Sequence, residues 1–405
     1  MNLPEAPPPP AVSVTSQITP KVLAALVCGQ LGLHSAMAGL RLAAPLQALR
    51  EGYNTWAVGL LLALFAAAPV LLALYSGRLA DRFGYHRPVR MAVGMTALGM
   101  VLAVLSTYVK GWPHFALLCC AASLTGAGTN MAMLTIQHTA ALAAGNSIER
   151  VRVFSWLGVA PAFANVLGPV TVGFVIDAGG FTWAYLAMLA LPLITVVSAR
   201  FVPQLPTAKL VQTATQGRAW DLLLAPGMKR LLLVNWLLSM CWDVHSFAVP
   251  ILGHERGFSA STIGLILGSF TLSVSLIRMA VPMLAHRLEE VQVVCAAMMG
   301  TALVFLLYPL AATPMLMVFC ALSLGITLGA VQPMIMSTLH RITPDGRHGE
   351  ALAFRSMAIN ASSTVMPLAF GVMGTVLGAG ILFWIVSGAV GSGAWVARGL
   401  RKAKT

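Results

Sequence analysis

Long apolar stretches separated by short polar joints run through the whole chain. A helix needs about 20 mostly apolar residues to cross a bilayer. Because these stretches do not alternate between apolar and polar residues with period two, they predict helices rather than barrel strands. The sequence therefore predicts an all-α integral membrane protein with twelve spans, at 22–48, 56–77, 88–109, 114–137, 151–176, 181–202, 229–252, 261–285, 291–311, 314–338, 351–376 and 380–397.

A polar segment divides the predicted spans into two sets of six. Residues 203–228 combine prolines, threonines and positive charges, a composition typical of a connector. We therefore expect two six-helix bundles, at 22–202 and 229–397. Residues 1–21 hold a run of four prolines and lack a signal-peptide pattern, so they are expected to be a disordered tail, and residues 398–405 a short basic one.

An internal repeat supports this division. When the chain is shifted by 205 positions, the end of the first span and the start of the second fall on the corresponding parts of the seventh and eighth, without gaps. A coincidence of this length indicates two related halves. The matched pairs include Pro45 and Pro250, Gly52 and Gly257, Gly59 and Gly264, and Phe65 and Phe270.

Composition and charge agree with a membrane protein. The chain is 58% hydrophobic and 9% charged, with a mean hydropathy of +0.83, whereas a soluble domain is about one quarter charged. Basic residues account for the net charge of +13 and fall in alternate joints, which places both termini and the connector in the cytoplasm and the chain in the inner (plasma) membrane. Nucleic-acid binding then needs no separate hypothesis. The residues assigned to the basic joints include Arg78, Arg82, Arg150, Arg287, Arg347 and Arg355.

Two short motifs resemble those of a known family. Residues 77–88 form a predicted charged loop, in which Gly84 permits a tight turn. The G-x-L-A-D-R-x-G spacing resembles the loop between helices 2 and 3 of major facilitator superfamily transporters, and Gly-Pro-x-x-x-Gly in the fifth span is similar to a motif of the same family. The residues concerned are Gly77, Asp81, Arg82 and Gly84, and Gly168, Pro169 and Gly173.

This resemblance covers nearly the whole chain and implies a fold and a mechanism. The family has two bundles related by an axis along the membrane normal, which alternate access to a substrate site near the midplane. The 77–84 motif would then help to latch the two halves through Asp81. The fifth-span motif has an alternative explanation, a proline kink with small residues for close helix packing.

Ionisable residues within the predicted spans are few, and each costs about 2.5–3.5 kcal/mol unless it has a partner, a watery cavity or a function. In the repeat register Asp243 corresponds to Ala38, one turn from Arg41. We therefore hypothesise an ion pair between Arg41 and Asp243, direct or bridged by substrate. Asp243 is also the best candidate proton carrier. The alternative is a permanent buried pair that only fixes helix packing.

Other polar residues are expected to line the cavity, because the family builds its cavity from helices 1, 4, 7 and 10. Histidines in such positions relay protons or are simply hydrogen-bonded wall residues. An arginine in the eighth span either extends toward the cytoplasm or faces an anion. The predicted cavity residues are Gln30, His34, Asn130, Gln137, His245, Arg278 and Gln332.

The sequence shows no machinery for catalysis. Phosphate-binding Gly-Lys loops, HExxH and paired catalytic carboxylates are absent from it. The six cysteines lie in apolar stretches without C-x-x-C spacing, so neither a metal site nor a disulfide nor a cofactor is expected. His340 and Asp345 have the spacing of some acyltransferases, but Asp345 lies within a Pro-Asp-Gly turn signal. We therefore do not expect an enzyme.

The combined prediction is a monomeric secondary transporter for a small neutral or anionic solute, coupled to protons. Interior arginines outnumber the single interior carboxylate, which disfavours an organic cation as substrate. A drug-efflux antiporter is the alternative within the family, although Ser123 stands where proton-driven exporters of the family often have arginine. A nontransporting sensor on a transporter scaffold is the alternative from a different class.

Overall fold

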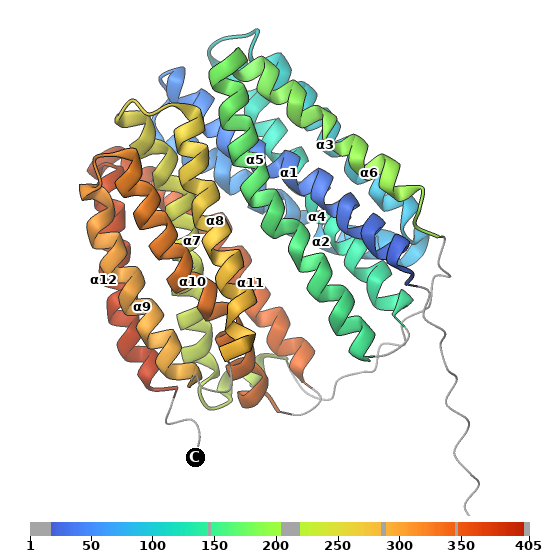
Figure 1. Ribbon diagram of the computed structural model, residues 1–405, viewed down its shortest axis with the longest axis vertical. Coiled ribbons are helices and arrows are strands. Elements are labelled where there is room, and N and C mark those ends of the chain that lie inside the picture. Colours follow the sequence, from blue (N-terminus) through green and yellow to red (C-terminus); the bar gives the residue numbers. More distant parts are fainter. Residues whose placement is uncertain (1–17, 145–146, 204–218, 285–288, 345–346, 401–405) are drawn as a thin grey trace, which may run out of the picture.

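The computed structural model describes residues 18–144, 147–203, 219–284, 289–344 and 347–400. These residues contain helices and no strand (Figure 1), which confirms the all-α prediction. The predicted tails beyond these limits and most of the connector lie outside the described residues. The helices are α1 (Pro20–Arg50), α2 (Thr55–Phe83), α3 (His86–Ser106), α4 (Trp112–Ala143), α5 (Ser147–Ala190), α6 (Pro192–Ala199), η1 (Ala219–Leu224), α7 (Met228–Glu255), α8 (Ala260–Leu284), α9 (Glu290–Leu307), η3 (Tyr308–Leu310), α10 (Pro314–Ile342), α11 (His348–Leu377) and α12 (Ala379–Arg398).

Among the described residues, 11 helical stretches are long and apolar enough to cross a membrane, and one of them holds two crossings. The stretch Arg152–Ala199 contains Gly180, whose φ of 83° interrupts the helix. Glycine adopts this left-handed conformation without the steric penalty of a Cβ. The segments on either side correspond to the predicted fifth and sixth spans, so the described residues hold long apolar helices at the places of all twelve predicted spans.

The helices form two groups. Helices α1 to α6 pack on one another, as do α7 to α12. Contacts between the groups come mainly from α5 with α8 and from α2 with α11. In Figure 1 the groups approach each other at the top and separate toward the bottom.

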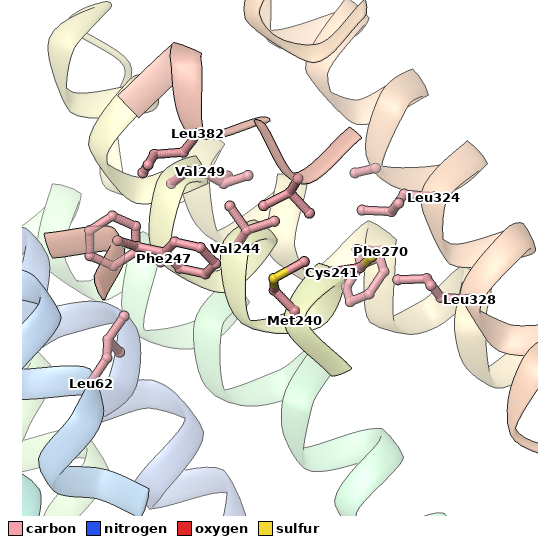
Figure 2. Close-up of a cluster of buried hydrophobic side chains, with 14 of the residues drawn as sticks. Leu62, Met240, Cys241, Val244, Phe247, Val249, Phe270, Leu324, Leu328 and Leu382 are labelled. Atoms are coloured by element: carbon pink, nitrogen blue, oxygen red, sulfur yellow. The ribbon is translucent and has the colours of Figure 1, made fainter. Parts of the chain in front are cut away.

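Helix α7 is largely buried, packing on α11 and α12 of its own group and on α1 of the other. Its Val244 and Phe247 are fully buried, and Figure 2 shows the side chains of this helix between Leu382 on one side and Leu324 and Phe270 on the other. Since lipid tails are as apolar as these side chains, the gain from this packing is van der Waals contact. The surrounding helices therefore fix the rotation of α7, which carries Asp243.

The sequence repeat has a structural counterpart at the ends of α1 and α7. Gly52 and Gly257 follow these helices with φ of 83° and 70°. Each glycine supplies the positive φ that a side chain would disfavour. Pro45 and Pro250 also lie at equivalent places inside the two helices. The two halves thus turn from their first to their second helix in the same way.

The groups touch closely at the end where Gly180 lies, called here the Asp177 end. A Cβ on Gly59 of α2 would meet the carbonyl oxygen of Pro367 in α11, and a Cβ on Gly264 of α8 would meet that of Pro169 in α5. These four residues form two equivalent crossings, because Gly59 and Gly264 are repeat partners. Small residues allow backbones to approach in this manner.

Polar contacts reinforce the closure at the Asp177 end. The Asp177 carboxylate on α5 accepts hydrogen bonds from the backbone N–H groups of Ala260 (3.0 Å) and Ser261 (2.7 Å) in α8. At the other crossing, the hydroxyls of Thr55 and Thr375 are 2.8 Å apart. Both contacts join the two helix groups.

The opposite end, called here the Asp81 end, differs from the prediction for residues 77–88. This segment is not a long loop, because α2 continues to Phe83 and α3 begins at His86. Gly84 has a φ of 65°, which confirms the predicted tight turn. Gly77 is helical, and a Cβ built on it would meet no neighbouring atom within 4 Å. It therefore does not serve close helix approach in this conformation.

Candidate functional site

A cavity of about 310 Å³ lies between the two helix groups. It is lined by residues 158–165 of α5 and 271–278 of α8, together with parts of α1, α7, α10 and α11. Along both α5 and α8, these segments lie between the tight crossings and the Asp81 end. The cavity is therefore closed off from the Asp177 end. Its charged lining residues are Arg41, Asp243 and Arg278.

Asp243 is buried, with 3% of its surface exposed. Its carboxylate accepts hydrogen bonds from the hydroxyls of Ser362 (2.6 Å) and Ser363 (3.1 Å) on α11. Hydrogen bonds to an ionised acceptor are among the stronger ones in proteins. The serine pair was missed at the sequence level, because serine within a span is usually a small packing residue. The side-by-side hydroxyls were the only available signal.

Arg41 lines the same cavity as Asp243 but does not touch it. Within the described part of the chain, no salt bridge joins the two side chains and Arg41 Nε has no hydrogen-bond partner. Their charges still interact across the cavity. The direct pair is thus not formed in this conformation, and a pair bridged by substrate stays a prediction.

A further arginine lies beside the cavity. The guanidinium of Arg355 donates a hydrogen bond to the side-chain oxygen of Gln332, which lines the cavity. Placing Arg355 in a polar joint was wrong, because α11 begins at His348 and Arg355 lies two turns inside it. Arg278 on α8 interacts electrostatically with Arg355. Three arginines therefore surround a site with one carboxylate.

A smaller cavity of about 160 Å³ adjoins the first and shares Arg41 and Ser363 with it. It lies between α1, α2, α4 and α11, and it holds the predicted residues His34 and Asn130. Gly126 of α4 also lines it. The two cavities together form one site with Arg41 between its parts.

Three predicted cavity residues lie outside the lining of both cavities. Gln30 is buried in α1, and Gln137 is half-buried in α4. His245 is fully buried, and its Nε2 lies 3.0 Å from the hydroxyl of Tyr308. The ring of His245 packs on Phe270, with 4.4 Å between centroids. In this conformation His245 serves helix packing.

Among the described residues, the interactions of Asp81 and Arg82 in the gating motif lie within their own helix group in this conformation. Asp81 Oδ1 lies 3.1 Å from Nε2 of His138 on α4. The guanidinium of Arg82 lies over the Phe83 ring, 5.1 Å from its centroid. Both interactions lie within the first helix group at its separated end. Latching across the groups through Asp81 remains a prediction for the opposite conformation.

The motif of the fifth span lies in close helix packing. A Cβ on Gly168 would meet backbone atoms of Ser35 and Gly39 in α1, and one on Gly173 would meet the carbonyl oxygen of Ala260 in α8. Pro169 forms one of the crossings at the Asp177 end. The motif thus joins α5 to its own group and to the other one.

Comparison with known proteins identifies the family. The profile of the Major Facilitator Superfamily matches residues 26–230 and 231–404. The chain belongs to the Major Facilitator Superfamily. It is 23% identical over 326 residues to the enterobactin exporter EntS of Salmonella typhimurium, covering 76% of this chain and 75% of that protein. EntS of Escherichia coli is 24% identical over 327 residues, with the same coverage.

Solved structures of other transporters share the fold. A POT family transporter in complex with 5-aminolevulinic acid has a TM-score of 0.71 at 12% identity, covering 95% of this chain and 96% of that one. A bacterial homologue of the iron transporter ferroportin in an inward-facing state has a TM-score of 0.70 at 16% identity, covering 96% and 100%. The protein is therefore a multi-pass membrane transporter of this superfamily.

Proposed function

We propose that this transporter exports a small anionic solute across the inner membrane by alternating access, coupled to protons. The observation that carries the proposal is the excess of arginine around the central cavity. Arg41 and Arg278 line it and Arg355 lies beside it, whereas Asp243 is the one carboxylate among the described lining residues.

A bound anion would supply the negative charge that Arg41 lacks in this site. Among the described residues no salt bridge joins Arg41 to the Asp243 carboxylate, which accepts two serine hydroxyls instead, so Asp243 does not neutralise Arg41 directly. A charge removed from water is costly unless it is paired. A substrate carboxylate or similar group would pair with Arg41 and restore the balance. This narrows the predicted neutral or anionic solute to an anionic one.

The conformation supports alternating access. The groups are held together at the Asp177 end by two glycine crossings and by the Asp177 cap, and the cavity lies beyond them toward the Asp81 end. The basic joints favour a cytoplasmic location for the Asp81 end. A cavity reached from the cytoplasm suits loading of a solute for export, and the EntS relatives are named as exporters.

Thermal unfolding of the purified protein in detergent tests the anion preference. Organic acids, sugars, amino acids and lipophilic cations are added at two pH values. We expect organic anions to raise the melting temperature of the wild type and of Arg50→Gln, a control at an exposed position on the same helix. Arg41→Gln should lose this response. Stabilisation by lipophilic cations alone would instead support drug efflux.

The direction of transport, export or uptake, is tested by measuring transport in membrane vesicles. In everted membrane vesicles, the face that was cytoplasmic is outside, so an exporter accumulates its substrate. We expect energised everted vesicles with the protein to accumulate the anion that stabilises it most. Accumulation in right-side-out vesicles only would establish uptake instead.

A further inference from the structure

We propose that the substrate carries, beside its anionic group, an apolar group about the size of a single ring, and that this group binds in the smaller cavity. The inference rests on the proposed anion site at Arg41 and deepens it. It assigns the two cavities to different parts of one substrate.

The two cavities are related by the internal repeat. Shifting the chain by 205 positions carries α1 and α2 onto α7 and α8. Residues that line the smaller cavity then fall on residues that line the larger one. The cavities are thus equivalent places in the two helix groups. The matched pairs include His34 and Ser239, Met37 and Trp242, and Ala66 and Thr271.

Helices α4 and α10 also occupy equivalent positions in the two helix groups. A Cβ on Gly126 of α4 would meet the carbonyl oxygen of Phe65, and one on Gly325 of α10 would meet that of Phe270, its repeat partner. In this register Met133 of α4 corresponds to Gln332 of α10. These two residues also line the smaller and the larger cavity respectively.

The chemistry of the two cavities differs although their positions correspond. At three matched positions the smaller cavity has a flexible or small apolar side chain where the larger one has an indole, a hydroxyl or an amide, whereas at a fourth, Thr129 and Leu328, the order is reversed. Methionine adapts to irregular shapes and its sulfur makes favourable contacts with aromatic rings. The part of the smaller cavity that is lined by Met37, Ala66 and Met133 therefore suits an apolar group. The substituted pairs are Met37 and Trp242, Ala66 and Thr271, and Met133 and Gln332.

The volume of the smaller cavity and the position of Arg41 also fit a ring attached to an anionic group. The smaller cavity measures about 160 Å³, close to the roughly 150 Å³ that accommodates benzene in a protein interior. Arg41 lines both cavities, so an anionic group placed at Arg41 leaves an attached ring at the mouth of the smaller one. His34 and Asn130 also line it and accommodate polar substituents on the ring.

Acetate and benzoate are suitable probes, because they share a carboxylate and differ by one ring. Binding to the purified transporter is followed by thermal unfolding and isothermal titration. We expect the wild type to bind benzoate on the order of tenfold more tightly than acetate, since the ring leaves water. Ala66→Leu, which fills the smaller cavity, should bring the ratio close to one and retain acetate binding. Leu71→Phe, an enlargement at an exposed position on the same helix, should keep the preference.

The outcomes separate this proposal from the one that it deepens. If neither anion binds the wild type, or if Arg41→Gln binds both unchanged, the anion site itself is wrong. If both bind through Arg41 but Ala66→Leu keeps the full benzoate preference, only the assignment of the smaller cavity is overturned. Size-exclusion chromatography of each variant verifies that it is folded. An Ala66→Leu protein that fails this check is replaced by Ala66→Val, with the same expected direction.

Discussion

The carboxylate of Asp177 on α5 accepts a 2.7 Å hydrogen bond from the backbone N–H of Ser261 in the first turn of α8. The two residues belong to different helix groups. The first N–H groups of a helix lack partners within the helix and favour a negative charge. One group thus caps a helix of the other at the closed end, and opening that end must break the cap.

Asp177→Ala is therefore expected to loosen the closed end. Without the carboxylate, the N–H groups of Ala260 and Ser261 lose their acceptor. Hydrogen–deuterium exchange of the peptide that covers the start of α8 should accelerate by roughly tenfold, since local opening governs exchange there. Glu51→Ala removes another carboxylate at the same end and should leave that peptide unchanged. Equal exchange in the wild type and Asp177→Ala would show that the cap does not hold the closure.

A methyl group at the α2–α11 crossing should also oppose closure. In Gly59→Ala the new Cβ meets the backbone oxygen of Pro367, which cannot rotate away. We expect destabilisation of about 1–3 kcal/mol, the usual effect of overpacking, measured as a lower melting temperature in detergent. Gly94→Ala in α3 is the control, because open space surrounds that position. A Gly59→Ala protein as stable as this control would contradict the crossing.

Asp243→Asn should stop transport that is coupled to protons but leave the exchange of one anion for another intact. The amide keeps the shape of the side chain but carries no titratable proton, so movement driven by a pH gradient is expected to stop. Exchange of labelled for unlabelled anion across proteoliposomes, which needs no net proton movement, should continue. Unchanged gradient-driven transport in Asp243→Asn would remove this residue from proton coupling.

The hydroxyl of Ser362 is expected to stabilise the fold through Asp243. Ser362→Ala deprives a buried carboxylate of one donor, and hydrogen bonds to charged groups contribute about 1.5–3 kcal/mol. The free energy of unfolding, measured by SDS titration in mixed micelles, should fall by that amount. Ser356→Ala, at an exposed position on the same helix, should change it little. A loss equal to that of Ser356→Ala would argue against the hydrogen bond.

Asp81→Asn tests the latch at the other end. In this conformation Asp81 contacts His138 of its own group, and a latch across the groups would form only when this end closes. We expect the substitution to slow transport by roughly an order of magnitude by shifting the population toward the present conformation. Anion affinity in detergent should be retained, and Arg78→Gln should transport normally. Normal turnover in Asp81→Asn would exclude the latch.

The sequence by itself determined the number of crossings, their helical nature and the family. A bilayer imposes these features locally, since each span must satisfy its own backbone and must be long and apolar enough to cross. The repeat likewise matched Gly52 with Gly257, whose common turn geometry the structure showed. Such features depend on residues that are near one another in the chain.

Only the tertiary structure decided which polar side chains meet. A helix turns by about 100° per residue, so a shift of one position moves a side chain from the cavity to a neighbouring helix. This rotation places Ser362 against Asp243 and Arg355 against Gln332, whereas His245 packs on Phe270 away from both cavities. The apolar length of a span carries no information on that rotation, because packing against the other helices sets it.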